Sequence, residues 1–215
     1  MSLTKVLIVE DHPLFSMGLI SLIICQPSYM VVGEANNIRD ALEQVRNKKP
    51  HLAIVDLNLG NENGMDLITE LKKIAPQIKI LVLSMYDERC HAEHVLQAGA
   101  HGYIMKDVAG DKIIDAIKTV MSGKIYLSDA EKERLYSFSC KANIKNDDNF
   151  FLIRKLTDRQ LQIFSLIGKG HGTADIAAKL NLSCKTVDAH KENIKSKILC
   201  DSSQLRQLAI EWNNR

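Results

Sequence analysis

The stretch Leu52-Ala-Ile-Val-Asp56-Leu-Asn58 is an apolar run that ends in a single carboxylate, and the turn-rich Gly60-Asn-Glu-Asn-Gly64 follows it. A short run rich in β-branched residues and bounded by turn residues is typical of a buried parallel strand. Asp56 then stands at the carboxyl end of the strand, where open parallel α/β sheets bind ligands. An Asp at this place can also simply form the turn after a strand. The neighbouring strand ends therefore decide between the two interpretations.

The first 125 residues repeat the alternation of strand and helix five times. The expected strands are 5–9, 30–34, 51–56, 78–83 and 101–105, and the expected helices are 13–25, 38–47, 65–74, 88–98 and 111–122. This alternation predicts an α/β domain with a parallel sheet and helices on both faces. Right-handed crossovers then bring the carboxyl ends of the strands to one shared edge.

Charged and polar residues follow the strands at that edge. Glu10 and Asp11 end the first strand, Asp56 the third, Ser84 the fourth and Lys106 the fifth. Because clustered carboxylates repel one another, the site is expected to bind a hard divalent cation such as Mg²⁺. An ionised carboxylate beside a metal ion can attack phosphorus and form an aspartyl phosphate. Lys106 then suits the phosphoryl oxygens, and Ser84 suits hydrogen-bond donation.

This constellation, with Gly64 eight residues after the aspartate, resembles the receiver domain of two-component response regulators over residues 4 to about 125. The resemblance implies a flavodoxin-like, doubly wound (βα)5 fold in which Asp56 accepts phosphate from a sensor histidine kinase. It also implies that Glu10, Asp11 and Asp56 hold Mg²⁺ together with the backbone carbonyl of Asn58.

The resemblance further implies a conformational switch. In the family, the hydroxyl after the fourth strand turns toward the phosphoryl group, and an aromatic residue three positions before the lysine moves inward. These residues are Ser84 and Tyr103 here, although Tyr103 could instead be a surface aromatic that closes the sheet edge. The family usually has Pro where this chain has Gly60, which leaves the stiffness of the loop beside Asp56 open. The fourth helix, fifth strand and fifth helix are the expected output surface.

The composition fits one large or two modest soluble domains. The chain has 215 residues, of which 46% are hydrophobic, enough for real cores. No apolar run approaches the roughly 20 residues of a membrane helix, and the N-terminus lacks a signal-type segment. Five cysteines without a Cys-x-x-Cys pair favour reduced thiols over disulfides or a zinc site. We expect a cytoplasmic protein with no membrane insertion.

The charge is distributed unevenly along the chain. Residues 1–150 hold 17 Lys and Arg against 20 Asp and Glu, whereas residues 151–215 hold 11 against 6. A basic C-terminal part behind an acidic N-terminal part is consistent with a nucleic-acid-binding module. A solvated surface explains charges of this modest size equally well.

Residues 125–151 differ from both flanking parts. Ser128-Asp-Ala-Glu131 has the pattern of a capping box and predicts a short helix that runs through residues 134–138. Residues 139–149 are polar and show no periodicity, which predicts a linker. We therefore expect domains at 1–125 and 152–215, joined by a short helix and linker at 126–151.

The last 65 residues show helix signals and no strand signals. Thr157 is expected to cap a helix over 158–167, Thr173 a helix to residue 180, Ser183 a helix over 184–198, and Ser202 or Ser203 a helix to 212. Four short helices, the second and third joined by a tight turn, predict an all-α helix-turn-helix domain.

The third of these helices is expected to lie against DNA. Val187, Ile194 and Ile198 recur at helical spacing and should face the core, with His190 as a structural residue at its edge. The residues expected to face DNA are Lys185, Thr186, Asp188, Ala189, Lys191, Glu192 and Lys195. Their lysines, together with Lys197, either contact phosphates or form a merely solvated basic face.

A second resemblance covers this part of the chain. Leu156-Thr157-x-Arg159, Ile176-Ala177-x-x-Leu180 and the long motif Lys185-Thr186-Val187-x-x-His190-x-x-Asn193-Ile194-x-x-Lys197-Ile198 resemble the LuxR-type DNA-binding domain. With the receiver they indicate a response regulator of the NarL/FixJ class. The resemblance implies binding to promoter DNA as a homodimer, with half-sites about 34 Å apart.

Departures from the LuxR-type pattern lie on the expected DNA-facing surface. Ala174 stands where relatives often have Lys, and Asp188 and Glu192 stand where they are often basic or polar. A carboxylate can accept from a cytosine amino group but repels phosphates, so we expect weak non-specific binding and an unusual operator. Gln160 and Gln162 replace common glutamates and receive no role. The alternative function is a phosphorylation-independent or protein-interaction regulator with weakened DNA binding, and we expect no enzyme proper in either case.

Overall fold

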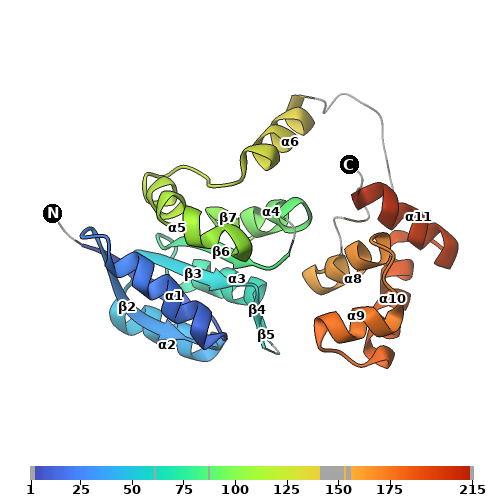
Figure 1. The fold of residues 1–215 in the computed structure, drawn as a ribbon, viewed down its shortest axis with the longest axis horizontal. Helices are drawn as coiled ribbons and strands as arrows, with labels where there is room; N and C mark the ends of the chain where they lie inside the picture. Colours follow the sequence, from blue (N-terminus) through green and yellow to red (C-terminus); the bar gives the residue numbers. More distant parts are fainter. Residues whose placement is uncertain (1–2, 61, 87, 141–152, 154–155, 214–215) are drawn as a thin grey trace. The chain divides into compact units, whose positions relative to one another are not determined.

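The computed structural model describes residues 3–60, 62–86, 88–140, 153 and 156–213. The chain forms two compact units, Met1–Ser139 and Cys140–Arg215, which are called the N-terminal and the C-terminal unit below (Figure 1). The finer division at residues 125 and 151 stays a prediction. Within the described residues, no helix is both long and apolar enough to cross a membrane.

A five-stranded parallel sheet runs through the middle of the N-terminal unit, in the strand order β2-β1-β3-β6-β7. Its strands are β1 (Thr4–Val9), β2 (Tyr29–Ala35), β3 (Leu52–Asp56), β6 (Lys79–Ser84) and β7 (Gly102–Met105). All five expected strands are present, with ends that differ by at most one residue. Every residue of β3 is buried, as a continuous apolar run in the centre of a parallel sheet requires.

Helices cover both faces of this sheet (Figure 1). They are α1 (Pro13–Ile24), α2 (Ile38–Lys48), α3 (Gly64–Ile74), α4 (Glu88–Gln97) and α5 (Lys106–Met121). The second, third and fourth pack on one face against residues such as Val55, whereas the first and fifth pack on the other against residues such as Ile54. Because neighbouring strand residues point to opposite faces, one strand supplies both cores. The expected doubly wound α/β fold is confirmed.

The expected start of the fifth helix at residue 111 is wrong. Helix α5 begins at Lys106, directly after β7, with Met105 as its N-cap residue. Gly110 weakens the helical pattern of the first turns, but Asp107 in the first turn is favourable near the positive end of the helix dipole. Lys106 is therefore fixed by the strand before it and by the helix that it begins.

The turn-rich segment after Asp56 contains a small hairpin that was not expected. Strands β4 (Asn58–Leu59) and β5 (Glu62–Asn63) pair antiparallel, and Gly60 at the turn has φ +61°. A Pro cannot adopt this φ because its ring holds φ near −65°. Gly60 therefore gives this loop a backbone that the Pro usual in the family would not allow.

A further segment covers the outer edge of β7. The backbone N–H of Tyr103 donates to the carbonyl of Tyr126 over 2.9 Å, and the N–H of Tyr126 donates to the carbonyl of His101 over 3.0 Å. Gly102 and Tyr126 form an isolated parallel bridge. The chain leading out of the N-terminal fold is thus hydrogen-bonded to the strand that carries Tyr103.

Helix α6 (Asp129–Cys140) follows this segment. The Ser128 hydroxyl accepts the N–H of Glu131 over 3.2 Å, which confirms the expected cap. In a reciprocal capping box the Glu131 carboxylate would accept the N–H of Ser128. Here the Glu131 carboxylate pairs with Arg134, and the N–H of Ser128 donates to Glu88 over 2.9 Å. The helix continues two residues beyond its expected end, and the remainder of the expected linker, 141–149, lies outside the described residues.

The C-terminal unit contains the four expected helices. They are α8 (Asp158–Gly168), α9 (Thr173–Leu180), α10 (Cys184–Ile198) and α11 (Ser202–Asn213). Phe164, Val187 and Ile194 are fully buried among them. A Cβ on Gly168 would overlap the Ala209 backbone, which shows how closely the first and last of these helices approach.

The tight connection between α9 and α10 has two local causes. Asn181 adopts the left-handed conformation with φ +51°, which Asn tolerates better than most residues. The Ser183 side chain caps the next helix by accepting from the N–H of Thr186 over 3.0 Å, as expected. The expected cap at Thr173 is wrong by one position, because Gly172 is the N-cap and its N–H donates to Asp175 over 3.2 Å. Thr173 is free to use its hydroxyl elsewhere.

Candidate functional sites

A buried cluster of charges lies at the carboxyl edge of the sheet in the N-terminal unit. Glu10 follows β1, Asp56 ends β3 and Lys106 follows β7, and their exposed fractions are 4%, 2% and 8%. The Lys106 Nζ lies 2.8 Å from Asp56 Oδ2 and 2.7 Å from Glu10 Oε2. It also lies 4.7 Å from the centre of the Phe15 ring. The sequence therefore brings residues 46 and 50 positions apart into one ion-pair network.

This environment shifts the pKa of Asp56 and of Lys106. Burial is the main cause that raises the pKa of Asp56 to about 6, and the nearby Glu10 adds to it, while Lys106 opposes the shift. Burial alone would lower the pKa of Lys106, but its ion pairs and hydrogen bonds with Asp56 and Glu10 outweigh burial and raise it. Lys106 thus remains a cation at neutral pH, and Asp56 is mostly ionised there.

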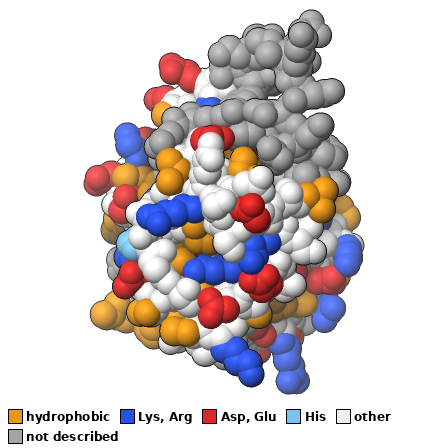
Figure 2. All heavy atoms as spheres, turned by 90° about the vertical axis from the view of Figure 1, so that its right-hand side faces the viewer, with side chains coloured by type: hydrophobic (Ala, Val, Ile, Leu, Met, Phe, Trp, Pro, Cys, Tyr) orange, Lys and Arg blue, Asp and Glu red, His pale blue; other side chains and the backbone are white. Residues whose placement is uncertain are grey.

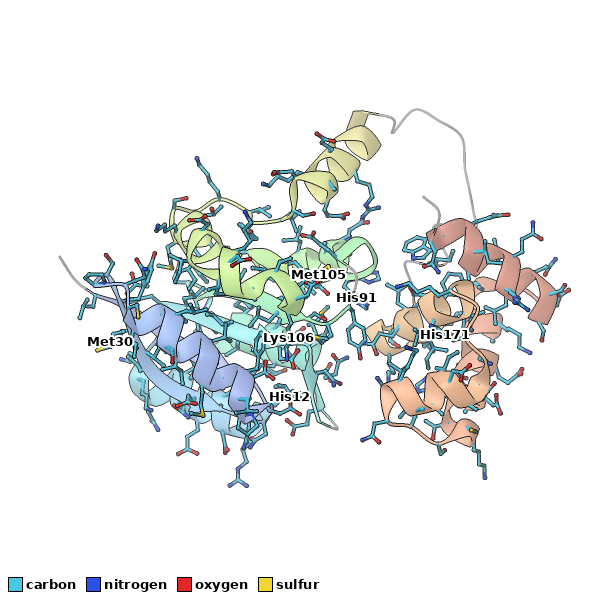
Figure 3. All side chains as sticks on the ribbon, viewed as in Figure 1. His12, Met30, His91, Met105, Lys106 and His171 are labelled. Carbon is cyan, nitrogen blue, oxygen red and sulfur yellow. The ribbon has the colours of Figure 1, made fainter. Side chains whose placement is uncertain are left out.

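Asp11 and His12 extend the cluster toward the surface, with 23% and 64% of their side chains exposed; Figure 3 labels His12 beside Lys106. The His12 Nδ1 lies 2.8 Å from Asp11 Oδ1 and 3.0 Å from Glu10 Oε1. Ligand atoms of Glu10, Asp11, His12 and Asp56 all lie within 4.8 Å of one another. Among the described residues, Glu10 Oε2 and Asp11 Oδ1 are buried oxygens that accept no hydrogen bond, although each takes part in an ion pair. Such crowded carboxylate oxygens fit a hard divalent cation.

The backbone beside Asp56 is built around Gly64. Its N–H donates to the carbonyl of Leu57 over 2.9 Å. A Cβ at this position would overlap the Asp56 carbonyl oxygen and lie 2.7 Å from the Leu57 Cα. Only glycine therefore lets α3 begin this close to the strand end. The N–H of Asn58 is hydrogen-bonded to Asp56, while the expected metal contact of its carbonyl stays a prediction.

The two expected switch residues lie inside the fold. Ser84 and Tyr103 are fully buried, so Tyr103 is not a surface aromatic. The Ser84 hydroxyl accepts the N–H of Tyr86 over 3.1 Å, and the Tyr103 hydroxyl donates to the carbonyl of Tyr86 over 2.8 Å. Both side chains thus hold the same short segment between β6 and α4.

The third helix of the C-terminal unit, α10, presents the expected two faces. Val187, Ile194 and Ile198 are buried, and His190 is half-buried with a pKa that burial and the neighbouring Arg159 lower. Of the residues expected to face DNA, Thr186, Lys191 and Lys195 are half-buried; the exposed ones are Lys185, Asp188, Ala189 and Glu192. The core prediction for this helix is confirmed, while its DNA contacts stay predictions.

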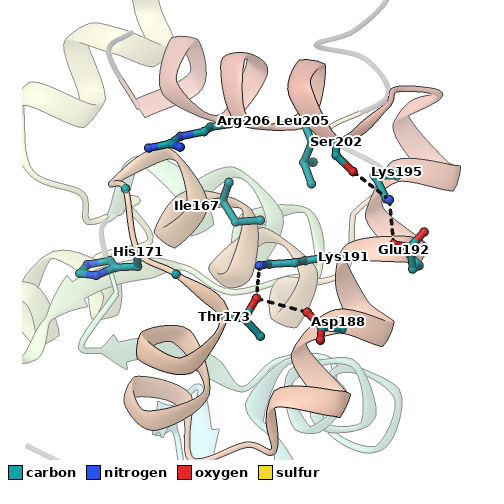
Figure 4. A pocket seen from close by; sticks show the side chains of 12 residues that line it. Ile167, His171, Thr173, Asp188, Lys191, Glu192, Lys195, Ser202, Leu205 and Arg206 are labelled. Carbon is teal, nitrogen blue, oxygen red and sulfur yellow. Dashed lines mark hydrogen bonds and ion pairs between the residues drawn. The ribbon is translucent and has the colours of Figure 1, made fainter.

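Several of these charged side chains are bonded to one another (Figure 4). Thr173 Oγ1 donates to Asp188 Oδ1 over 3.2 Å and accepts from Lys191 Nζ over 2.6 Å. Lys195 Nζ lies 2.7 Å from Glu192 Oε1 and donates to Ser202 over 3.2 Å. These groups line a cavity of about 510 Å³. On the face drawn in Figure 2, acidic side chains are interspersed among the basic ones.

Two glutamines without an expected role have structural ones. Gln160 completes a reciprocal capping box with Thr157, in which the two N–H to side-chain distances are 3.0 and 3.3 Å. It also accepts from Lys197 over 2.8 Å, so this lysine is held against α8. Gln162 accepts from Arg159 over 2.9 Å. The pattern Thr157-x-x-Gln160 in the sequence predicts this capping box.

Comparisons with known proteins assign a family to each of the two units. Residues 6–118 match the response regulator receiver domain, and residues 154–209 match the bacterial regulatory proteins of the luxR family. The chain is 33% identical over 199 residues to the oxygen regulatory protein NreC of Staphylococcus haemolyticus and 34% identical over 200 residues to that of Staphylococcus carnosus. Each alignment covers 90% of both chains.

Solved structures show the same fold. A LuxR-family two-component response regulator from Aurantimonas is 27% identical with a TM-score of 0.58, covering 62% of this chain and 99% of that one. RcsB from Salmonella enterica serovar Typhimurium, bound to the promoter rprA with a phosphomimetic, covers 100% of both chains with a TM-score of 0.62 at 21% identity. The expected resemblance is therefore confirmed: the chain belongs to the two-component response regulators of the NarL/FixJ class, with a receiver domain followed by a LuxR-type DNA-binding domain.

Proposed function

We propose that this response regulator is controlled by phosphorylation of Asp56 and that the phosphorylated chain binds promoter DNA as a homodimer. A sensor histidine kinase supplies the phosphoryl group in a Mg²⁺-dependent reaction. The observation that supports this proposal best is the buried network of Glu10, Asp56 and Lys106 at the sheet edge, in a chain that also carries a helix-turn-helix.

The carboxylates of Glu10, Asp11 and Asp56 would hold the metal ion, together with the Asn58 carbonyl. When bound, Mg²⁺ would offset the carboxylate repulsion and stabilise negative charge on the phosphoryl oxygens. A carboxylate oxygen of Asp56 attacks phosphorus; the new P–O bond forms as the P–N bond to the kinase histidine breaks, and that imidazole keeps the electron pair. Lys106, held protonated by its raised pKa, then moves its ion pair from the carboxylate to the phosphoryl oxygens.

The switch would act on the segment between β6 and α4. A phosphoryl group on Asp56 offers the Ser84 hydroxyl a charged acceptor, which competes with the present contact between Ser84 and the N–H of Tyr86. The carbonyl of Tyr86 is the acceptor for Tyr103, so movement of this segment changes the position of both side chains.

Hydrogen bonds connect the surroundings of this segment to α6. Glu88, the first residue of α4, accepts the N–H of Ser128, which caps α6. The backbone N–H of Tyr103 donates to the carbonyl of Tyr126, two residues before that cap. These contacts connect the switch residues to the helix after which the chain continues into the DNA-binding unit.

The first test is mass spectrometry of the full chain after incubation with Mg²⁺ and a small phosphodonor, beside Asp56→Asn and the matched surface variant Asp66→Asn. We expect a phosphoryl adduct on the wild type and on Asp66→Asn but not on Asp56→Asn. A folded wild type without an adduct would overturn the phosphorylation model.

A second candidate function is a protein-interaction regulator with weakened DNA binding. The pairing of Lys191 and Lys195 with groups of their own domain favours it, because these lysines then offer less charge to phosphates. Titration of duplex DNA binding with salt separates the two candidates. Binding that weakens steeply as salt rises supports the transcription regulator, whereas no binding at low salt supports the interaction protein.

A further inference from the structure

Asp188 is exposed on α10, which is the recognition helix in the proposed DNA-binding function, yet its carboxylate is held in place from another helix. Its Oδ1 accepts the hydroxyl of Thr173, the first residue of α9, over 3.2 Å. The same hydroxyl accepts from Lys191 over 2.6 Å. A hydroxyl can donate one hydrogen bond and accept another, so Thr173 can bond to Asp188 and Lys191 at the same time. Figure 4 shows the three side chains meeting at one wall of the cavity.

The tether leaves one carboxylate oxygen for another partner. Among the contacts of the described residues, Asp188 Oδ2 accepts no hydrogen bond, whereas Oδ1 is occupied. Lys191 places a positive charge on the far side of the Thr173 hydroxyl, which reduces the repulsion between the carboxylate and nearby DNA phosphates. Asp188 is thus an oriented hydrogen-bond acceptor whose negative charge is partly balanced within the domain.

Glu192 lacks such a tether. Its carboxylate pairs with Lys195 one turn away on the same helix, and 72% of its side chain is exposed. Lys195 is only 20% exposed and donates to Ser202, but among the described residues the Glu192 carboxylate itself has no bond to another helix, and a carboxylate this exposed is held weakly by its pair. Of the two acidic residues on the outer face, only Asp188 has a fixed direction in the free protein.

The position of Asp188 and the chemistry of bases select the partner. It is the fifth residue of α10, which begins at Cys184, and the N-terminal part of a recognition helix contacts base edges in the major groove. A carboxylate only accepts hydrogen bonds. Guanine presents two acceptors there, thymine one acceptor and a methyl group, and adenine an acceptor beside its amino donor, whereas cytosine presents an amino donor alone.

We propose that Asp188 selects cytosine at one position of each operator half-site and that Thr173 is the positioning residue that directs its carboxylate. The proposal rests on the DNA-binding function proposed above. It names the base that the recognition helix reads and adds a residue outside that helix to its specificity. Exchanging the selected C·G pair should weaken binding by roughly 5- to 150-fold, the range typical of one specific base contact.

The test is selection of duplexes from a random pool by the full chain, with and without a phosphodonor and Mg²⁺, followed by sequencing. The wild type should enrich C at one position of each half-site. Asp188→Asn, whose amide both donates and accepts, should shift that position to A and leave the others unchanged. The matched control Glu211→Gln, an exposed carboxylate on α11 outside the expected DNA-facing residues, should keep C at the same position.

Thr173 is tested in the same selection. Thr173→Val should reduce the enrichment of C at that position, and Thr173→Ser, which keeps the hydroxyl, should restore it. A purely structural role would lower affinity for all sequences without changing the preferred base. Circular dichroism checks that each variant folds.

The results distinguish a failure of the Asp188 assignment from a failure of the proposed DNA-binding function. If the wild type enriches a site but Asp188→Asn enriches the same base, the assignment of Asp188 is wrong while DNA binding stands. If the wild type enriches no sequence at any salt concentration, the proposed promoter binding fails and the assignment falls with it. The assignment is also overturned if the wild type prefers a base other than C at the position whose preference changes in Asp188→Asn.

Discussion

The buried pocket around Asp56 and the outer face of α10 use the same kinds of side chain in opposite environments. In the pocket, Glu10, Asp56 and Lys106 are at most 8% exposed and bond to one another from three different strand ends. On α10, Glu192 pairs with Lys195 one turn away, and its side chain is 72% exposed. Carboxylates and lysines form ion pairs in both places, but only one set has been removed from water.

The difference shows that burial decides what an ion pair contributes. A buried charge costs several kcal/mol in lost hydration, so each member of the pocket depends on its partners. An exposed pair contributes about 0–1 kcal/mol, so either member can change without loss of the fold. The pocket is therefore constrained by folding, whereas the exposed side chains of α10 can change without loss of the fold.

Removing Lys106 tests the buried side of this comparison most strongly. Lys106→Met leaves the Glu10 and Asp56 carboxylates buried without their cation, and we expect a loss of about 3–5 kcal/mol in unfolding free energy at pH 7. Mg²⁺ should recover part of the loss. Urea unfolding followed by circular dichroism measures it, with the exposed Lys112→Met as control. A loss below about 1 kcal/mol would show that the pair is not needed for folding.

Gly64 and Gly110 form a second test within the same unit, with effects of opposite sign. Gly64→Ala places a Cβ against the Asp56 and Leu57 backbone, and we expect a loss of about 2–4 kcal/mol and slower phosphorylation. Gly110→Ala lies within α5 and meets nothing within 4 Å, so it should gain about 0.5–1 kcal/mol. Equal stabilities in urea unfolding would mean that the backbone beside Asp56 adapts freely.

The pocket could be predicted from sequence because its residues follow a rule of topology. Asp56 and Lys106 stand at the ends of apolar strands, and parallel strands with right-handed crossovers bring such ends together. Gly64 could be recognised because it stands eight residues after Asp56 in the sequence. The helix start at Lys106 was missed because Gly110 interrupts the helical pattern, and the hairpin around Gly60 was missed because its strands have two residues each.

The contacts of the recognition helix follow no comparable rule. Thr173 and Asp188 are 15 residues apart and meet only because of the angle between α9 and α10. Hydrophobic spacing predicted which face of α10 is buried, but it carries no information on the rotamers of exposed side chains. The capping box of Thr157 and Gln160 differs in this respect, since its two members are three residues apart and their contact is local.

His101 tests an intermediate case, in which a half-buried group has no counter-ion within the described part of the chain. Its Nδ1 accepts the N–H of Ile80 over 3.2 Å, and burial, with the charges of Lys79 and Lys72, lowers its pKa to about 4. The unfolded chain binds a proton near pH 6.5, whereas the folded chain does not until about pH 4. This contribution to stability is therefore full above pH 6.5 and is lost as pH falls toward 4.

We expect the loss between pH 7 and pH 4.5 to include about 1–2 kcal/mol from His101, after allowance for solvent screening. Urea unfolding across this range, compared between the wild type and His101→Gln, measures the contribution as a difference in slope. Parallel stability curves for the two proteins would contradict the assignment of a neutral His101.

The smallest effect on stability is expected on the recognition helix. The double variant Asp188→Asn, Glu192→Gln removes two exposed carboxylates, and its unfolding free energy should change by less than about 0.5 kcal/mol. Its affinity for random duplex DNA at low salt should rise roughly thirtyfold, because each of the two lost repulsions beside a phosphate is worth on the order of 1 kcal/mol. Fluorescence anisotropy with labelled duplex measures this rise. If the double variant instead unfolds readily, the surface ion pairs hold the domain together as the buried ones do, and burial no longer explains the difference between the two regions.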